Sequence, residues 1–343
     1  GFLRRVNVLG QLGSVVEERE VAVGLGQGGQ GHLHVYRTAE GAPSEPRSRQ
    51  LPWSAYNLAV GEAHPAYGDI DGDGLDECVV GMGRYPADGG YVLVFDDAQH
   101  GGALLRWLRV PWTAYNAMNG ATWPACGDID GDARAEIVVG LGAGGQGNFY
   151  VFDDATDGFG VIGSRQLPWA EYNRNPSGGE TRVACGDVDG DGLAEVVVGL
   201  GQGGQGRWAV FEDAWQGLSF GRWNTIEWPQ YVTGGAGTSR PACGDVDGDG
   251  LAEIVMGLER GSQGRMPYID DAVAGFRTLQ WIEAGEAPYR TAVGHTRPAL
   301  GDTDNDGDAD LAVGFATGGQ AQVQVFRRST PQGPFLHRFF PQV

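Results

Sequence analysis

The chain has 343 residues, with 44 Asp or Glu against 24 Arg or Lys, and its formal net charge is −20 at pH 7. This acidity favours solubility and argues against nucleic acid or anionic membrane as partners, because both are bound through basic surfaces. All of the 24 cationic residues are Arg, which excludes lysine Schiff-base chemistry. The 60 glycines, 17 prolines and 41% hydrophobic residues fit a turn-rich all-β chain.

Short apolar runs that end in glycine recur along the whole chain. In chain order their glycines are Gly24, Gly81, Gly140, Gly199, Gly257 and Gly314. Around the middle copies, strand-like runs bounded by Gly, Asp or Pro are expected at 148–154, 161–169, 183–185 and 195–200. No stretch keeps a helical period with caps, so almost no helix is expected.

Six such units predict an all-β, six-bladed β-propeller with four antiparallel strands per blade, as one domain over residues 1–343. The first unit keeps its glycine-ended run at 20–24, and the last unit closes with the run at 334–340. The chain is therefore expected to begin near the first strand of its first blade and to end after the fourth strand of its last. A shared closing strand is not expected.

An aspartate-rich loop recurs five times, beginning at Gly68, Gly127, Gly186, Gly244 and Gly301, at intervals of 57 to 59 residues. Each loop lies between the first and second strands of its unit, and the first unit has no Asp at this place. Carboxylates at loop positions 1, 3, 5 and 9, with a backbone carbonyl at position 7, form an oxygen set that suits Ca²⁺. Asp and Gly also dominate ordinary polar turns, but five copies in one register favour about five structural Ca²⁺.

The predicted metal ligands are Asp69, Asp71, Asp73, Leu75, Glu77, Asp128, Asp130, Asp132, Arg134, Glu136, Asp187, Asp189, Asp191, Leu193, Glu195, Asp245, Asp247, Asp249, Leu251, Glu253, Asp302, Asp304, Asp306, Asp308 and Asp310.

These loops, the glycine-ended runs and the GxGxGGxGxxxVF segments resemble the FG-GAP or VCBS repeat family, the calcium-bearing propellers of integrin α-subunit heads and bacterial surface proteins. More distantly, the chain is similar to the integrin-like fungal lectins. It departs from the integrin pattern in having six units instead of seven. Four of its loops have Glu at position 9, and only Asp310 is the shorter acid that is more usual there. The resemblance implies a calcium-binding module for adhesion or carbohydrate recognition.

In antiparallel blades, the 1–2 and 3–4 turns open on one face and the 2–3 and 4–1 connections on the other. The aspartate loops therefore share a face with acidic turns such as Asp96 and Asp153. The other face gathers glycine–glutamine turns, which start at Gly26, Gly142 and Gly201, and a repeated Pro-Trp…Tyr-Asn phrase. Its predicted ligand-binding residues are Trp53, Tyr56, Asn57, His64, Trp112, Tyr115, Asn116, Trp123, Trp169, Tyr172, Asn173, Arg182, Arg240 and Arg297.

Two interpretations of these residues remain open. Aromatic rings could stack on sugars while amides bond hydroxyls, or the tryptophans could be inter-blade packing. The favoured function is a binding module for glycans or extracellular proteins. One alternative is a propeller enzyme, such as a polysaccharide lyase or a phytase-like phosphatase, with a site near His64, Arg182 and Arg240; another is a scaffold without a ligand. No catalytic signature is present, and the GxGxxG-like turns precede no helix, so they do not predict a nucleotide site.

Cys126, Cys185 and Cys243 hold one position in three successive units, and Cys78 lies in a glycine-ended run. Free, buried cysteines are expected at all four places. Calcium loops of this simple kind favour a secreted, periplasmic or cell-surface location, and Arg without Lys suggests a bacterial source. No signal peptide or transmembrane segment is recognised, as expected for a mature chain or a cytosolic one.

Overall fold

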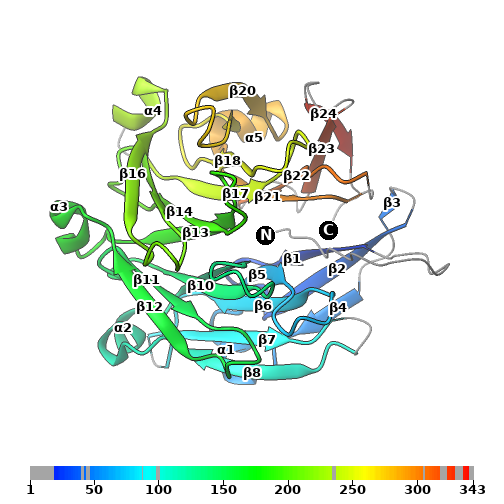
Figure 1. Ribbon diagram of the computed structural model, residues 1–343, viewed down its shortest axis with the longest axis vertical. Coiled ribbons are helices and arrows are strands. Elements are labelled where there is room, and N and C mark those ends of the chain that lie inside the picture. The colour runs from blue at the N-terminus through cyan, green and yellow to red at the C-terminus, as the bar shows by residue number, and fades with distance from the viewer. Residues whose placement is uncertain are drawn as a thin grey trace.

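The computed structural model describes residues 19–39, 42–43, 47–86, 88–97, 101–233, 237–303, 306–316, 323–328 and 335–339. In this part of the chain, six antiparallel sheets follow one another and surround a common axis (Figure 1). This arrangement confirms the predicted six-bladed propeller. None of the helices described is long and apolar enough to cross a membrane.

Blades 2 to 6 each contain four strands that pair in the order of the chain. The strands are β5 (Ala63–Gly68), β6 (Glu77–Met82), β7 (Tyr91–Phe95) and β8 (Leu104–Arg109) in blade 2; β9 (Thr122–Gly127), β10 (Glu136–Leu141), β11 (Asn148–Phe152) and β12 (Val161–Gln166) in blade 3; β13 (Thr181–Gly186), β14 (Glu195–Leu200), β15 (Arg207–Phe211) and β16 (Phe220–Thr225) in blade 4; β17 (Arg240–Gly244), β18 (Glu253–Gly257), β19 (Arg265–Ile269) and β20 (Thr278–Glu283) in blade 5; and β21 (Thr296–Gly301), β22 (Asp310–Phe315), β23 (Val323–Arg328) and β24 (Phe335–Phe339) in blade 6.

Blade 1 is narrower than the others. It consists of β1 (Arg19–Gly24) and β2 (His32–Ala39), and both β3 (Ala42–Pro43) and β4 (Arg47–Gln50) pair with β2. Because β1 contains the first repeat glycine, it corresponds to the second strand of the other blades. The expected first strand of this blade would precede β1 and lies outside the described residues.

The core lies between the blades. The second strands β10 and β14 are buried along their whole length because each is covered on both faces, which explains their uninterrupted apolar runs. Val138 of blade 3, for example, packs in one cluster with Val196 and Val198 of blade 4. The outer strand β8 is exposed at all but one residue. A further cluster joins Val21 and Val23 to blade 6, so the ring closes through apolar packing.

The aromatic connections between blades fold into single helical turns, contrary to the expectation of almost no helix. These are α1 (Ser54–Ala59), α2 (Thr113–Met118), α3 (Ala170–Arg174), α4 (Pro229–Thr233) and α5 (Ala287–Ala292). A single turn is too short to show helical periodicity or to be stable alone. It is held instead by its tyrosine: the Tyr115 hydroxyl donates to the Ala121 carbonyl and accepts the Gly142 N–H at 2.7 Å.

The repeat glycines mark where neighbouring blades approach most closely. A Cβ atom on Gly140 would lie 2.5 Å from the Thr181 carbonyl oxygen of the next blade, and one on Gly199 would lie 2.4 Å from that of Ser239. No side chain fits at such a distance, so these apolar runs must end in glycine.

The cysteines fill a second close contact between blades. A Cβ atom on Gly127, at the end of β9, would lie 2.7 Å from Cβ of Cys185. The buried slot predicted for Cys126, Cys185 and Cys243 is confirmed, and no disulfide links the four cysteines. Cys78 differs from the expectation, because it is only half-buried on β6.

We predict that Gly140→Ala destabilises the protein by about 1–3 kcal/mol, the usual cost of overpacking a core. Gly160→Ala is the matched control, because the nearest atom to its new Cβ is 3.8 Å away and its φ is not in the left-handed region. Chemical denaturation of both variants measures the difference. Equal stability of the two would contradict the steric role of the repeat glycine.

Candidate functional site

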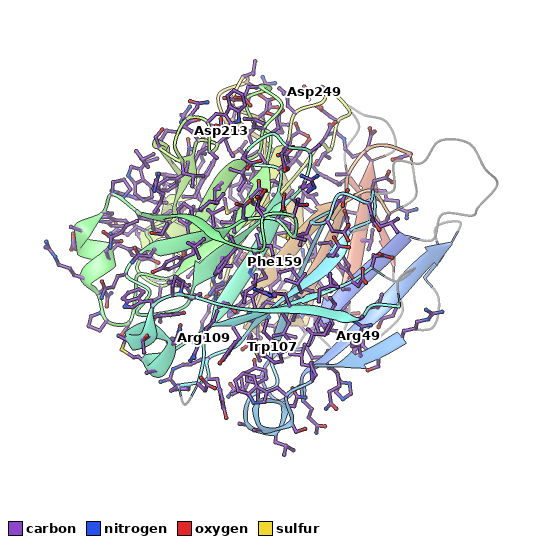
Figure 2. All side chains as sticks on the ribbon, turned by 60° about the horizontal axis from the view of Figure 1, so that its bottom comes forward. Arg49, Trp107, Arg109, Phe159, Asp213 and Asp249 are labelled. Atoms are coloured by element: carbon purple, nitrogen blue, oxygen red, sulfur yellow. The ribbon has the colours of Figure 1, made fainter. Side chains whose placement is uncertain are left out.

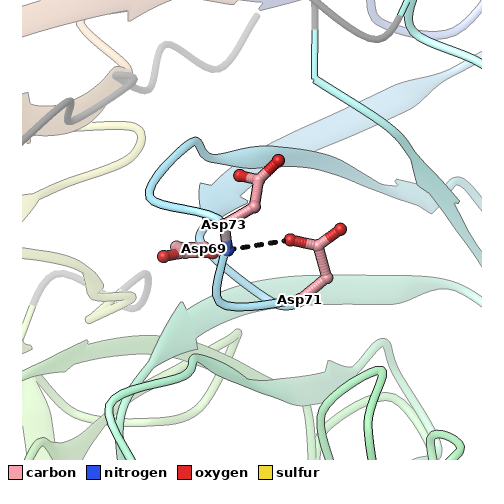
Figure 3. Close-up of side chains that lie close together, drawn as sticks. All are labelled: Asp69, Asp71 and Asp73. Atoms are coloured by element: carbon pink, nitrogen blue, oxygen red, sulfur yellow. Dashed lines mark hydrogen bonds between the residues drawn. The ribbon is translucent and has the colours of Figure 1, made fainter.

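Each aspartate loop is folded by its own carboxylates. In blade 2 the loop joins β5 to β6, and Asp69 accepts hydrogen bonds from the N–H groups of Gly72 at 2.8 Å and Gly74 at 3.0 Å. Asp71 accepts the N–H of Asp73 at 3.1 Å, as Figure 3 shows, and Asp73 accepts that of Leu75 at 2.9 Å. The alternating acids therefore turn the loop back on itself through bonds to its own backbone.

This folding brings together the acids at loop positions 1, 3 and 5. One oxygen from each of Asp69, Asp71 and Asp73 lies within 4.8 Å of the others, and the corresponding trio in blade 3 forms the same group. The predicted loops thus lie where expected, between first and second strands. Asp304, one of the predicted ligands in blade 6, lies outside the described residues.

The glutamate at position 9 groups with an acid from outside its loop, which the predicted ligand set does not include. One oxygen of Glu77 groups with oxygens of Asp71 and of Asp96, which lies in the 3–4 turn. Its Oε2 atom accepts the Ile70 N–H at 2.8 Å, whereas its Oε1 atom is buried without a hydrogen-bond partner among the described residues. The same unpartnered Oε1 atom occurs in the position-9 glutamates of the next three blades, Glu136, Glu195 and Glu253.

Burial, together with the charges of neighbouring aspartates, raises the pKa of each of these four glutamates to about 8. Each glutamate is 0% exposed. A buried carboxylate beside like charges is costly unless a cation compensates it. Unpartnered buried oxygens, high acid density and hard oxygen donors therefore fit a divalent cation such as Ca²⁺.

The loops also connect neighbouring blades. The main-chain carbonyl of Asp128 accepts the N–H of Ala194, which lies in the loop of the next blade, at 2.7 Å. The Ile129 carbonyl accepts the N–H of Ala214 from the next 3–4 turn at 3.1 Å. This face is acidic beyond the loops: Asp213, from a 3–4 turn, and Asp249, from a loop, lie at the same end of the molecule in Figure 2.

On the opposite face, the predicted tyrosines and asparagines are mainly structural. Tyr56, Tyr115 and Tyr172 are buried, and their hydroxyls bond backbone groups on both sides of the connection. Asn57, Asn116 and Asn173 are buried as well, and each donates from Nδ2 to a backbone carbonyl at 2.7 Å. These six side chains hold the helical turns in place and leave little surface for a ligand.

The tryptophans of the aromatic phrase are half-buried. Trp53, Trp112 and Trp169 each stack on the tyrosine three residues later, with ring centroids 5.4 to 5.6 Å apart. Trp169 also faces the Arg207 guanidinium at 4.4 Å. Part of each indole therefore packs between blades while another part remains accessible.

Trp169 lines a cavity of about 700 Å³ between α2 and α3. Met118 borders it from α2, and the exposed glutamines Gln146 and Gln166 border it from blade 3. Arg174 and the exposed residues 175–176, which follow α3, complete its polar rim. Of the residues predicted to bind a ligand, only Trp169 and Asn173 belong to this cavity. Gln146 belongs to the glycine–glutamine turn that was expected on this face, whereas Met118, Gln166 and Arg174 were not predicted because they do not recur within the aromatic phrase.

The remaining predicted residues meet at the propeller axis. His64, Trp123, Arg182, Arg240 and Arg297 each pair in register with the repeat glycine of the following strand. They therefore lie within the first strands, and the first strand of blade 4 includes Arg182, which the expected run at 183–185 leaves out. All but Arg297 line one small cavity whose wall is built by the first strands of blades 2 to 6.

Stacking and ion pairs join these axial side chains. The His64 ring stacks on Trp123 with centroids 3.6 Å apart, and the guanidinium groups of Arg182 and Arg240 lie 4.8 Å and 5.0 Å from the same indole. Glu259 accepts hydrogen bonds from Arg182 at 3.0 Å and from Arg240 at 2.7 Å. The axial arginines are thus compensated by carboxylates that sequence reasoning missed.

Glu62 completes this axial network. Its carboxylate lies 3.1 Å from Nε2 of His64. Burial alone would raise its pKa, but His64 and Arg297 lower the pKa to about 2. Glu62 is therefore ionised and paired, in contrast to the position-9 glutamates of the loops.

We predict that protein freed of divalent cations loses stability between about pH 5 and pH 8. The position-9 glutamates have folded-state pKa values of about 8, above the ordinary 4.5, so the folded state binds more protons in this interval and unfolding becomes easier as pH rises. Thermal melts across this range measure the loss.

Glu136→Gln provides the control for this prediction. The amide keeps an acceptor for the Ile129 N–H but cannot ionise, so the variant should lose less stability than the parent over the same pH range. An identical slope in both proteins would contradict the assignment.

Comparison with known proteins agrees with the fold. A lectin from Agrocybe aegerita, described as recognising non-reducing terminal N-acetylglucosamine, matches with a TM-score of 0.51 and 14% identity, over 98% of this chain and 90% of its own. A protein from Lactobacillus plantarum matches with a TM-score of 0.50 and 14% identity, over 99% and 83%. A Bacillus licheniformis rhamnogalacturonan lyase matches with a TM-score of 0.41 and 15% identity, over 91% and 66%.

At these identities the first two matches establish the fold alone, and the third supports no argument. No curated protein matches the chain in sequence. Residues 187–256, from the loop of blade 4 to the second strand of blade 5, match the family described as the FG-GAP-like repeat. The chain is therefore a six-bladed β-propeller that contains the FG-GAP-like repeat.

Proposed function

We propose that this propeller is a calcium-stabilised module that binds glycans on the face opposite its aspartate loops. The observation that supports this most is the cavity of about 700 Å³ beside Trp169. Its size lies within the range of small-molecule sites, and its lining combines an accessible indole with several polar side chains. The lectin from Agrocybe aegerita shows that a propeller of this fold can recognise a sugar.

The chemistry of the cavity suits a sugar ring better than a charged metabolite. The apolar face of a pyranose can rest on Trp169 and on Met118, which is 53% exposed. Its hydroxyls can exchange hydrogen bonds with Gln146, Gln166 and Arg174, which are all exposed at the rim. Amides and guanidinium groups supply donors without the excess positive charge that a phosphate site would need.

Several blades share the elements of this site. Gln30, Gln146, Gln205 and Gln263 occupy equivalent turns with φ between 53° and 55°, and each is exposed. Half-buried tryptophans, Trp53, Trp169 and Trp228, follow the first three of these turns in the connections. Weak individual sites on one rigid ring would act together on a branched or repeated glycan, because linked binding raises the effective concentration.

The proposed calcium ions would stabilise the ring without contacting the ligand. Bound at the aspartates of loop positions 1, 3 and 5, a cation compensates charges that otherwise repel one another. The loop then keeps its backbone bonds to the next blade, such as the one from Ala194 to the Asp128 carbonyl. A need for abundant Ca²⁺ supports a location outside the cytosol, at the cell surface, in the periplasm or in the medium.

An enzyme has less support from the geometry. The candidate catalytic group at the axis would use His64, Arg182 and Arg240, but Glu62 and Glu259 already pair with these side chains. An anionic substrate would have to displace those buried carboxylates. We therefore propose binding as the function, and turnover of polyuronate or phytate would be the result that favours the alternative.

We predict that removal of Ca²⁺ with EDTA lowers the melting temperature, and that added Ca²⁺ restores it. A site present only in the folded state stabilises it by about 2.7 kcal/mol when the ligand is a hundredfold above Kd. Asp128→Asn should reproduce part of the loss, whereas Asp88→Asn, an exposed residue outside the loops, should not. A melting curve insensitive to EDTA would rule out coupled cation sites.

We predict that Trp169→Ala weakens glycan binding at least about tenfold, which corresponds to about 1.4 kcal/mol. An array that includes glycans with terminal N-acetylglucosamine identifies the ligand, and calorimetry measures the affinities. Trp215→Ala is the matched control, because Trp215 is 80% exposed but lies in a 3–4 turn on the acidic face. Equal losses in the two variants, or no glycan bound by calcium-loaded protein, would contradict the proposal; a protein captured through Trp169 would redirect it.

A further inference from the structure

The turn between the third and fourth strands contributes an acid to a second carboxylate cluster. In blade 3, one oxygen from each of Asp130, Glu136 and Asp153 lies within 4.8 Å of the others. Asp130 lies in the loop between β9 and β10 and Glu136 is the first residue of β10, whereas Asp153 follows β11. The cluster therefore spans two separate turns, and no backbone hydrogen bond connects Asp130 with Asp153.

An unpartnered buried oxygen indicates that this cluster accepts a ligand. Glu136 is 0% exposed, and its Oε2 atom accepts the N–H groups of Ile129 at 2.7 Å and Asp130 at 3.3 Å. Its Oε1 atom is equally buried but accepts no hydrogen bond from any residue that the structure describes. A buried carboxylate oxygen left without a donor is expensive, so a cation is the missing partner that this arrangement fits.

The second cluster is distinct from the loop cluster. The loop trio consists of Asp128, Asp130 and Asp132, and only Asp130 belongs to both groups. Blade 2 repeats this division: Asp69, Asp71 and Asp73 form one group, and Asp71, Glu77 and Asp96 form the other. A carboxylate has two oxygens, so the shared aspartate can serve two neighbouring ions.

Blade 6 contains a built-in cation at the same place. Phe152 pairs with Ile137 in blade 3, and Phe326 pairs with Leu311 in blade 6, so Arg327 is the counterpart of Asp153 and Asp310 is the counterpart of Glu136. The Arg327 Nε atom lies 3.2 Å from Oδ2 of Asp310.

The residue at loop position 9 and the first residue of the 3–4 turn thus differ together between blade 6 and blades 2 and 3. An acid in the turn accompanies a glutamate with an unpartnered oxygen, and an arginine in the turn accompanies a paired aspartate. The Arg327 guanidinium group of blade 6 compensates the carboxylate there, as a metal ion would in blades 2 and 3.

We propose that blades 2 and 3 each bind a second divalent cation, Ca²⁺ by ligand chemistry, between the aspartate loop and the 3–4 turn. Its ligands are Asp71, Glu77 and Asp96 in blade 2, and Asp130, Glu136 and Asp153 in blade 3. The ion fastens the outer hairpin of a blade to the loop that contacts the next blade. This proposal rests on the proposed function only because the second site and the proposed loop site take the same ion.

Native mass spectrometry of the full chain with Ca²⁺ counts the bound ions. Asp153→Arg copies the arrangement of blade 6 and should lower the count by one, while circular dichroism keeps the β signal. Asp128→Asn removes a ligand of the loop cluster only and should lower the count by one on its own. The double variant should lose two ions. A loss of one ion in the double variant, or an unchanged count in Asp153→Arg, would overturn the second site.

The reverse exchange tests the same site if Asp153→Arg fails to fold. The combined variant Asp310→Glu with Arg327→Asp gives blade 6 the acids of blade 3 and should gain one Ca²⁺. Arg327→Asp with Asp310→Asn, which adds an acid but removes the second one, serves as its control and should gain none. Equal counts in both variants would contradict the proposal. Because Asp128→Asn reports on the loop ion separately, failure of the loop calcium and failure of the second site give different results.

Discussion

The ring depends on loops that must concentrate carboxylates and join blades at the same time. The Asp128 carboxylate accepts the N–H groups of Gly131 and Ala133, while the main chain of the same residue accepts the N–H of Ala194 in the next blade. The loop cannot lose its acids without losing its shape. Yet burial raises the pKa of Glu136 to about 8, which shows how strongly the fold opposes another charge there. Structure and electrostatics conflict in these loops, and a bound cation would remove the conflict.

The two faces of the propeller differ in how strictly their residues are fixed. On the acidic face, loop geometry is repeated closely because each loop must fit both its own hairpin and its neighbour. On the opposite face, only the buried tyrosine and its backbone bonds are fixed, since they hold each helical turn. Residues at the exposed ends of these turns are free to vary, as Met118 and Arg174 do. Variation on a fixed frame is how recognition sites usually arise on a propeller.

The sequence was sufficient for the fold because its strongest signals report contacts between blades. Gly140 and Gly127 mark places where no side chain fits, and equivalent glycines recur in neighbouring units. The short helices escaped prediction because a five- or six-residue turn has no period, and Tyr115 stabilises it through distant backbone groups. The partners of the axial arginines escaped for a different reason: Glu259 lies 77 residues from Arg182, and no repeat relates the two.

A ligand would have to displace more existing interactions at the propeller axis than at its periphery. His64, Trp123, Arg182 and Arg240 hold one register position, yet their chemistry differs from blade to blade, so a symmetric backbone carries one asymmetric cluster. Its charges are already paired internally, and a ligand would have to replace charge-assisted hydrogen bonds that are among the stronger ones in proteins. The polar groups around Trp169 are exposed to water and need no such exchange. A ligand at the rim would therefore require less rearrangement, and repetition around the ring would compensate for the weakness of each proposed site.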